Sequence, residues 1–138
     1  MEKIVSLVSG PEIIQSITCT HDDEERMSGY AVQTNKQTIS MLIDNEQNCC
    51  EDWGYMLSED EPEIFVGATL HNVTLTDTAL KTVELYHDCD NDTYNDTVFV
   101  NLETDRGTLQ FVAYNIHNGY YGHKVQISSH QLTHEEVI

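Results

Sequence analysis

Lysine and arginine are scarce in this sequence. Its 138 residues include 24 aspartate and glutamate residues but 6 lysine and arginine residues, for a formal net charge of -18. Binding to nucleic acid by phosphate neutralisation needs a stripe of basic side chains, and binding to anionic membranes needs a basic cluster. We therefore expect no direct contact with nucleic acid or membranes. We expect partners of positive charge, either a basic groove on another protein or metal cations.

Long apolar runs are also missing. No stretch approaches the length of a membrane span, and Met1–Val8 has neither a long apolar core nor a cleavage site. We expect no signal peptide and therefore a soluble protein of the cytoplasm. In that reducing compartment Cys19, Cys49, Cys50 and Cys89 are expected to be free thiols.

Known catalytic motifs are the third absence. The sequence contains no nucleophile elbow, P-loop, dinucleotide fingerprint or zinc-protease motif. Carboxylates are so abundant that chance pairs are expected, and these identify no acid–base pair. We expect a protein that is not an enzyme and that needs no cofactor.

What the sequence does contain is β-type alternation. Tyr30–Thr34 and Gln37–Ile43 flank a polar dipeptide and predict a hairpin with one buried face. Val98–Leu102 and Thr108–Tyr114 predict a second hairpin, joined through the turn signal Thr104–Gly107.

The remaining elements are shorter. Pro11 suits the first position of a helix over residues 11–17, but a strand over 15–20 fits almost as well. Further strands are predicted at 64–66, 68–75, 82–87 and, as the last one, 124–128. The expected class is β-rich α+β, an antiparallel meander or sandwich with one or two short helices. We expect a single domain over residues 1–138, with a polar tail from about residue 129.

Two groups of residues in the sequence partly resemble metal sites. Asp88, Asp90 and Asp92 alternate like the start of a calcium loop, but the sixth position of that loop is Thr93 and the twelfth is Phe99, where glycine and glutamate are required. An acidic hairpin loop is the better interpretation.

The second group is Cys49-Cys50-Glu51. Adjacent cysteines cannot easily direct two sulfur atoms to one tetrahedral zinc ion, so structural thiols are favoured there.

The acidic runs are the main candidate site. A solvated surface that aids solubility is the simple interpretation, but about 2–8 net charges are enough for a small domain. The alternative is that carboxylates on a β scaffold resemble the charge pattern of a nucleic-acid backbone and occupy the basic surface of a nucleic-acid enzyme. The candidate partner-binding residues lie in three loops: Asp22, Asp23, Glu24, Glu25, Glu59, Asp60, Glu61, Glu63, Asp88, Asp90, Asp92 and Asp96.

A second candidate site surrounds a turn-rich connector. His117 and His123 bracket Asn118–Gly122, where an outward Tyr120 or Tyr121 can stack on a base. A hairpin turn with one core tyrosine is the simpler interpretation. If the protein forms oligomers, Arg106 or Lys124 can hold a phosphate beside these tyrosines, which describes a sponge for a nucleotide signal.

Two short motifs carry a resemblance to a known family. With Asn48-Cys49-Cys50-Glu51 and Asn118-Gly119-Tyr120-Tyr121, the chain resembles small proteins of tailed bacteriophages that form a domain family of unknown function. That family pairs Cys-Cys-Glu with a late Asn-Gly-Tyr-Tyr at the start of its final strand, and the similarity spans most of residues 37–128. Here Gly122 and His123 follow the tyrosines, where the family has serine and an acidic residue. The resemblance implies a phage or prophage gene expressed in a bacterial cytoplasm, and it implies no particular chemistry.

Together these observations favour an anti-defence protein that inhibits a host nucleic-acid-binding immune enzyme, of CRISPR or restriction type. Its acidic loops would bind the basic surface of that enzyme. The oligomeric nucleotide sponge is the alternative. A metal protein built on Cys49 and Cys50, and a structural phage protein whose acidity is incidental, are the remaining hypotheses.

Overall fold

The structure, a computed structural model, describes residues 7–8, 11–24, 26–46, 52–59, 61–76, 94–117, 122–130 and 132–138. Residues 52, 94–96 and 116–117 are described by their backbone alone. The elements of this part of the chain are β1 (Glu12–Asp22), β2 (Met27–Thr34), β3 (Thr38–Asp44), β4 (Asp52–Leu57), the 3-10 helix η1 (Pro62–Phe65), β5 (Thr69–Thr76), β6 (Tyr94–Thr104), β7 (Gly107–His117), β8 (Lys124–Ser128) and β9 (Thr133–Val137).

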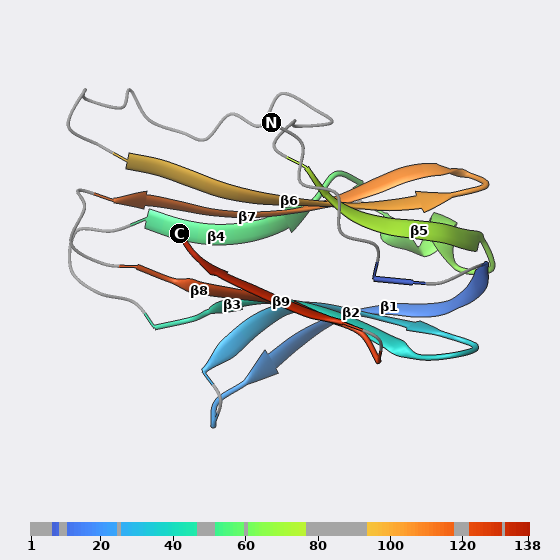
Figure 1. Cartoon of the computed structure of the whole chain (residues 1–138), viewed down its shortest axis with the longest axis horizontal. Coiled ribbons are helices and arrows are strands. Elements are labelled where there is room, and N and C mark those ends of the chain that lie inside the picture. The colour runs from blue at the N-terminus through green and yellow to red at the C-terminus, as the bar shows by residue number, and fades with distance from the viewer. Residues whose placement is uncertain are drawn as a thin grey trace.

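The described strands form one antiparallel sheet that folds over into two layers. The strand order is β4-β7-β6-β5-β1-β2-β3-β8-β9. One layer contains β4, β7, β6 and β5, and the other contains β1, β2, β3, β8 and β9 (Figure 1). The corner lies in β1, which pairs with β5 at Glu12 and Ile13, passes a bulge between Ile14 and Ser16, and then pairs with β2. The β-rich antiparallel class is confirmed, and the sandwich describes it better than the meander.

Both predicted hairpins are present. In the β2–β3 hairpin, Gln33 pairs with Thr38, and the Thr34 N–H donates to the Gln37 carbonyl at 2.8 Å to close the turn. In the β6–β7 hairpin, Thr104 pairs with Gly107, whose φ of 115° is a conformation that favours glycine. The β5 and β8 strands also match their predictions.

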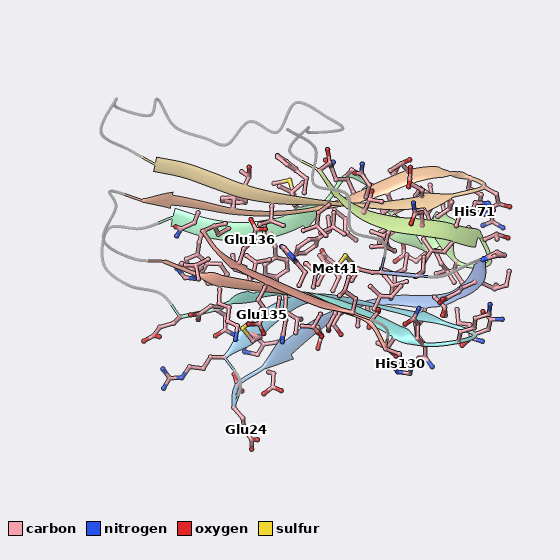
Figure 2. All side chains as sticks on the ribbon, viewed as in Figure 1. Glu24, Met41, His71, His130, Glu135 and Glu136 are labelled. Atoms are coloured by element: carbon pink, nitrogen blue, oxygen red, sulfur yellow. The ribbon has the colours of Figure 1, made fainter. Side chains whose placement is uncertain are left out.

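The core lies between the layers and follows the alternation in the sequence. Ile39, Met41 and Ile43 of β3 are all fully buried, and Figure 2 shows Met41 between the two layers. Phe111 of β7 and Leu102 of β6 meet them from the other layer. Burial of each such side chain stabilises the fold by roughly 1.5–3 kcal/mol, which favours packing of the two apolar faces against each other.

Three predicted elements are wrong. The helix over 11–17 is wrong and the alternative strand over 15–20 is confirmed as part of β1, because β-branched Ile13, Ile14 and Ile17 lie in a sheet and Glu12 is held by tertiary hydrogen bonds. The strand over 64–66 is the 3-10 helix η1, which begins at Pro62, a residue with no N–H for a ladder. The tail after 129 contains a ninth strand, β9, so 124–128 is not the last one.

Two further predictions concern residues 82–87 and Asp96. The strand predicted at 82–87 lies outside the described residues. Asp96, placed in a loop by the sequence, lies within β6, which begins at Tyr94 and pairs residue by residue with β7.

Candidate functional site

The turn between β1 and β2 carries three exposed carboxylates of the predicted set. Asp22, Asp23 and Glu24 are all exposed, and the side chain of Asp23 is 90% accessible. The Oδ1 of Asp22 accepts the Glu24 N–H at 2.9 Å, which shapes the turn. Glu24 points away from both layers at the projecting end of this hairpin (Figure 2).

Two more carboxylates adjoin this turn from the end of β3. Asp44 pairs with Met27, and the Asn45 N–H donates to the Arg26 carbonyl at 2.9 Å, which brings residues 44–46 beside the turn. We call Asp22, Asp23, Glu24, Asp44 and Glu46 the acidic end. Arg26 faces Glu46 at 3.6 Å between exposed side chains, a pair that contributes little to stability.

His21 ties the turn to the sheet. Its Nε2 lies 2.6 Å from Oδ1 of Asp23, and its Nδ1 lies 2.7 Å from Oγ of Ser28. The Asn45 amide donates to the same Ser28 oxygen at 3.0 Å. These bonds hold the acidic turn in a defined position on β2 and β3.

The order Asp23, His21, Ser28 is that of the carboxylate, imidazole and hydroxyl in serine hydrolases, but the geometry does not support a nucleophile. Ser28 is 3% exposed, and Asn45 also bonds its Oγ. A nucleophile needs room for a reacting carbon at about 3 Å. We interpret the chain of hydrogen bonds as one that positions the acidic turn.

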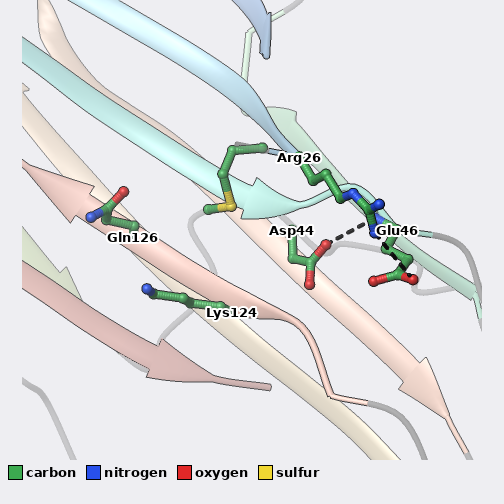
Figure 3. Close-up of a pocket in the computed structure, with 6 residues that line it drawn as sticks. Arg26, Asp44, Glu46, Lys124 and Gln126 are labelled. Carbon is green, nitrogen blue, oxygen red and sulfur yellow. Dashed lines mark hydrogen bonds and ion pairs between the residues drawn. The ribbon is translucent and has the colours of Figure 1, made fainter. Parts of the chain in front are cut away.

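The acidic end borders a shallow pocket of about 250 Å³ on the β3–β8 side (Figure 3). Arg26, Met27, Asp44, Glu46, Lys124 and Gln126 line it. Lys124 is paired with Glu135 at 3.3 Å, and Arg26 faces Glu46. The pocket therefore has no excess positive charge that would favour an anionic ligand.

The second predicted acidic loop lies at the other end of β1. Glu61 and Glu63 are exposed at η1, and Glu59 is half-buried. The chain just after η1 bonds to Ile14, through Gly67 N–H to Ile14 O at 2.8 Å. Asp22 lies eight residues further along β1, roughly 26 Å away at about 3.3 Å per residue. The two acidic loops therefore do not form one patch.

Arg106 and Lys124, predicted to hold phosphate in the sponge hypothesis, lie in different layers. The Arg106 guanidinium donates to the carbonyls of Ile64 and Val66 at 2.7 and 3.0 Å, so it fastens η1 to the β6–β7 turn. Lys124 begins β8 beside the acidic end. Within one chain these two cations are not brought together.

His123 is placed inside the protein. It is fully buried, its Nδ1 lies 2.7 Å from the Asp44 carbonyl oxygen, and its ring lies 5.0 Å from that of Trp53. This position suits a structural histidine. His117 ends β7, and its side chain is not described.

Other predicted residues cannot be placed. Those outside the described residues are Glu25, Asp60, Asp88, Asp90, Asp92, Tyr120 and Tyr121, together with Cys49, Cys50, Glu51 and Cys89. For Asp96 the backbone alone is described.

The described part of the chain contains no group of three or more His, Cys, Asp or Glu side chains arranged to hold a metal ion. None of its helices has the length and apolar character to cross a bilayer. Cys19 of β1 is a free, exposed thiol.

Comparison with known protein families gives one match. Residues 3–127 match the family described as a domain of unknown function, DUF7448. The chain belongs to this family. No curated protein and no solved structure matches it. The DUF7448 match covers η1 and strands β1 to β7 in full, and β8 up to its last residue but one, so most of the two-layer fold lies within the family domain.

Within this DUF7448 chain, Asp44 and Glu46 are the site residues that sequence reasoning missed. The signal was present in the predicted β2–β3 hairpin. A hairpin closed at Asn35 and Lys36 places the residues after its second strand beside those before its first strand. The register alone was therefore enough to join residues 44–46 to the acidic turn.

Proposed function

We propose that this protein inhibits a nucleic-acid-binding defence enzyme of a bacterial host, of CRISPR or restriction type, by occupying its basic surface with acidic loops. We further propose a phage origin and action in the host cytoplasm. The acidic end is the principal contact. The observation that carries the proposal is its five carboxylates, set around a turn that His21 fastens to the sheet.

Charge and preorganisation both support this function. A net charge of -18 speeds association with a basic partner and repels nucleic acid. A turn already held by hydrogen bonds loses little conformational freedom on binding, so more of the electrostatic attraction remains as affinity.

The test compares two triple variants that remove equal charge from opposite ends of β1. One is Asp22→Asn, Asp23→Asn, Glu24→Gln, and the matched control is Glu61→Gln, Glu63→Gln, Glu103→Gln, whose side chains are also exposed. The wild-type protein is first used to capture its partner from a bacterial lysate at low salt, with elution by a salt ramp. Affinity and nuclease inhibition are then measured with that purified partner.

We expect the first variant to lower affinity at least tenfold, through slower association, and the control to lower it less than threefold. Equal losses in both variants would assign the effect to overall charge and not to the acidic end. Inhibition that survives both variants, or affinity that does not depend on salt, would overturn the proposal.

A further inference from the structure

Within the part of the chain that the structure describes, the β1 edge of the two-layer sheet lacks the usual protection. Beyond Ile13, no described strand pairs with the side of β1 that faces away from β2. Residues 15–20, with the sequence Gln-Ser-Ile-Thr-Cys-Thr, carry no charge and no proline. Free edges normally carry charges or proline, because a row of unpaired N–H and C=O groups attracts other strands.

The opposite edge of the same layer shows the contrast. Strand β9 carries three titratable side chains in five residues, with His134 bonded to Glu136 at 2.7 Å and Glu135 bonded to Lys124. That edge is guarded by charge, as expected for a solvent-exposed strand. Residues 15–20 of β1 lack the charged side chains that protect the β9 edge.

The interior beside this edge is also incompletely covered. Cys19 of β1 lies near Tyr55 of β4, with its Sγ 3.9 Å from the Tyr55 hydroxyl, and Ile17 shares the face of β1 that carries Cys19. Ile17, Tyr55 and Leu57 pack against the core yet are only partly buried. A strand added to β1 would place its inward side chains over this margin and extend the layer.

We propose that the β1 edge over residues 15–20 binds an extended segment of a partner protein by strand addition. The segment is uncharged where it pairs with β1 and carries Lys or Arg at the end that reaches Asp22, Asp23 and Glu24. In this mode main-chain hydrogen bonds supply affinity, and alternate side chains supply selectivity.

The β1 edge could pair with a second copy of this chain or with a segment of another protein, and charge favours the second. A second copy of this chain would bring a further net charge of -18 and its own acidic turn to the contact, which the first copy would repel. The acidic end at the far end of β1 instead complements a basic segment. The inference deepens the proposed function, since it names the part of a basic partner that docks beside the acidic end.

The probe is a synthetic peptide, Lys-Lys-Val-Thr-Val-Thr-Val-Thr, which in antiparallel pairing sets its lysines against Asp22 and Asp23 and its valines toward Ile17 and Cys19. Two further peptides have the same composition, one N-methylated on its three valines and the other on its three threonines. Successive amides of a strand point to opposite sides, so one methylated peptide is blocked on the side facing β1 and the other on its free side.

We expect the two methylated peptides to differ at least tenfold in affinity for the full chain. Hydrogen exchange should slow in residues 15–20 when the unmethylated peptide binds. Equal affinities for the two methylated peptides, protection that appears at β4 instead of β1, or no binding up to about 1 mM would each overturn the inference. The Asp22→Asn, Asp23→Asn, Glu24→Gln variant should weaken binding severalfold and keep the difference between the methylated peptides.

This design separates the two proposals. If the peptide binds at β1 but no basic enzyme is inhibited, the proposed function fails and strand addition stands. If a basic enzyme is inhibited through the acidic end and the peptide does not bind, strand addition fails and the proposed function stands.

Discussion

The imidazole of His21 holds the carboxylate of Asp23, with Nε2 2.6 Å from Oδ1, although the two side chains are 59% and 90% exposed. An ion pair or hydrogen bond this exposed contributes about 0–1 kcal/mol to folding. Its importance is therefore local. It fixes the direction of a carboxylate at the projecting turn, and the second ring nitrogen fixes the imidazole on Ser28.

The first prediction concerns that local order. His21→Ala is expected to change the free energy of unfolding by less than about 1 kcal/mol, because the exposed contact contributes little. Amide exchange in residues 22–26 is expected to rise severalfold, because the turn loses its tie to β2. Hydrogen exchange followed by mass spectrometry measures both effects.

His71→Ala is the matched control, since His71 is an exposed histidine on β5, toward the other end of the molecule (Figure 2). It should leave exchange in residues 22–26 unchanged. If His21→Ala gives the same exchange pattern as this control, the hydrogen bonds of His21 do not order the turn.

The second prediction concerns a buried carboxylate at the corner of the sheet. Glu12 is 2% exposed and accepts hydrogen bonds from the Thr34 hydroxyl at 2.5 Å and the Gln37 amide at 2.7 Å. Glu12→Ala leaves both donors without this partner and should destabilise the protein by about 1–3 kcal/mol. Glu12→Gln keeps an acceptor oxygen and should cost less.

Urea denaturation measures these changes, and Glu103→Ala, at an exposed glutamate on β6, serves as the control with an expected effect within about 0.5 kcal/mol. A Glu12→Ala variant as stable as this control would show that the buried hydrogen bonds at the corner are energetically neutral.

The third prediction concerns the close approach of β2 to β3 at Gly29. A Cβ on Gly29 would lie 1.9 Å from the Met41 carbonyl oxygen, which is backbone and cannot rotate away. Gly29→Ala should therefore destabilise the protein by about 3 kcal/mol, at the upper end of overpacking costs. Thermal unfolding should show a clear fall in Tm.

Gly107→Ala separates steric conflict from backbone conformation. Gly107 has a φ of 115°, but nothing lies within 4 Å of its added Cβ, so the cost there is conformational strain alone. We expect it to be smaller than the cost at Gly29. The reverse order would contradict the close approach of the β2 and β3 backbones.

Local pattern was enough to predict the hairpins and their buried faces. Ile39, Met41 and Ile43 alternate with polar residues, and a face of this kind has to be covered. The acidic turn at Asp22–Glu24 was also visible, because a polar run between two strands is typically a turn.

The elements that could not be predicted depend on partners distant in the sequence. Glu12 is typical of the start of a helix, and no residue near it in the sequence indicates its hydrogen bonds to Thr34 and Gln37. Strand β9, with the sequence Thr-His-Glu-Glu-Val, has no apolar alternation, because it is an edge strand held by its pairing with β8. The β1–β5 corner likewise rests on one short pairing that no local signal marks.

The fourth prediction concerns the response to salt. A net charge of -18 repels itself in the compact state, and at 0.1 M ionic strength screening acts over about 10 Å. Stability should therefore rise as sodium chloride increases from 10 to 300 mM, measured as a rise in Tm of several degrees. A Tm that falls with salt would show that attractive ion pairs, such as Lys124 with Glu135, outweigh the repulsion.

The last prediction concerns alkaline pH. Burial between the layers raises the pKa of Tyr55 above its ordinary value of 10.0, and the neighbouring Cys19 raises it further, while a hydrogen bond with Ser28 acts in the opposite direction. Burial also raises the pKa of Tyr30, and Cys19 adds to that effect. The folded protein therefore holds these protons to a higher pH than the unfolded chain does. The contribution of these two tyrosines to stability is fully present below about pH 10 and is lost as the pH rises through their pKa values in the folded protein.

The free energy of unfolding, measured in urea from pH 8 to 11.5, should fall more steeply above pH 10 for the wild-type protein than for Tyr55→Phe. The variant lacks one of the two protons whose retention favours the folded state, so its curve should be flatter even if it is less stable at pH 8. Parallel curves for the two proteins would mean that Tyr55 titrates alike in the folded and unfolded chains. The hydroxyl would then be open to water, and the margin between β1 and β4 would already be wet before any strand is added.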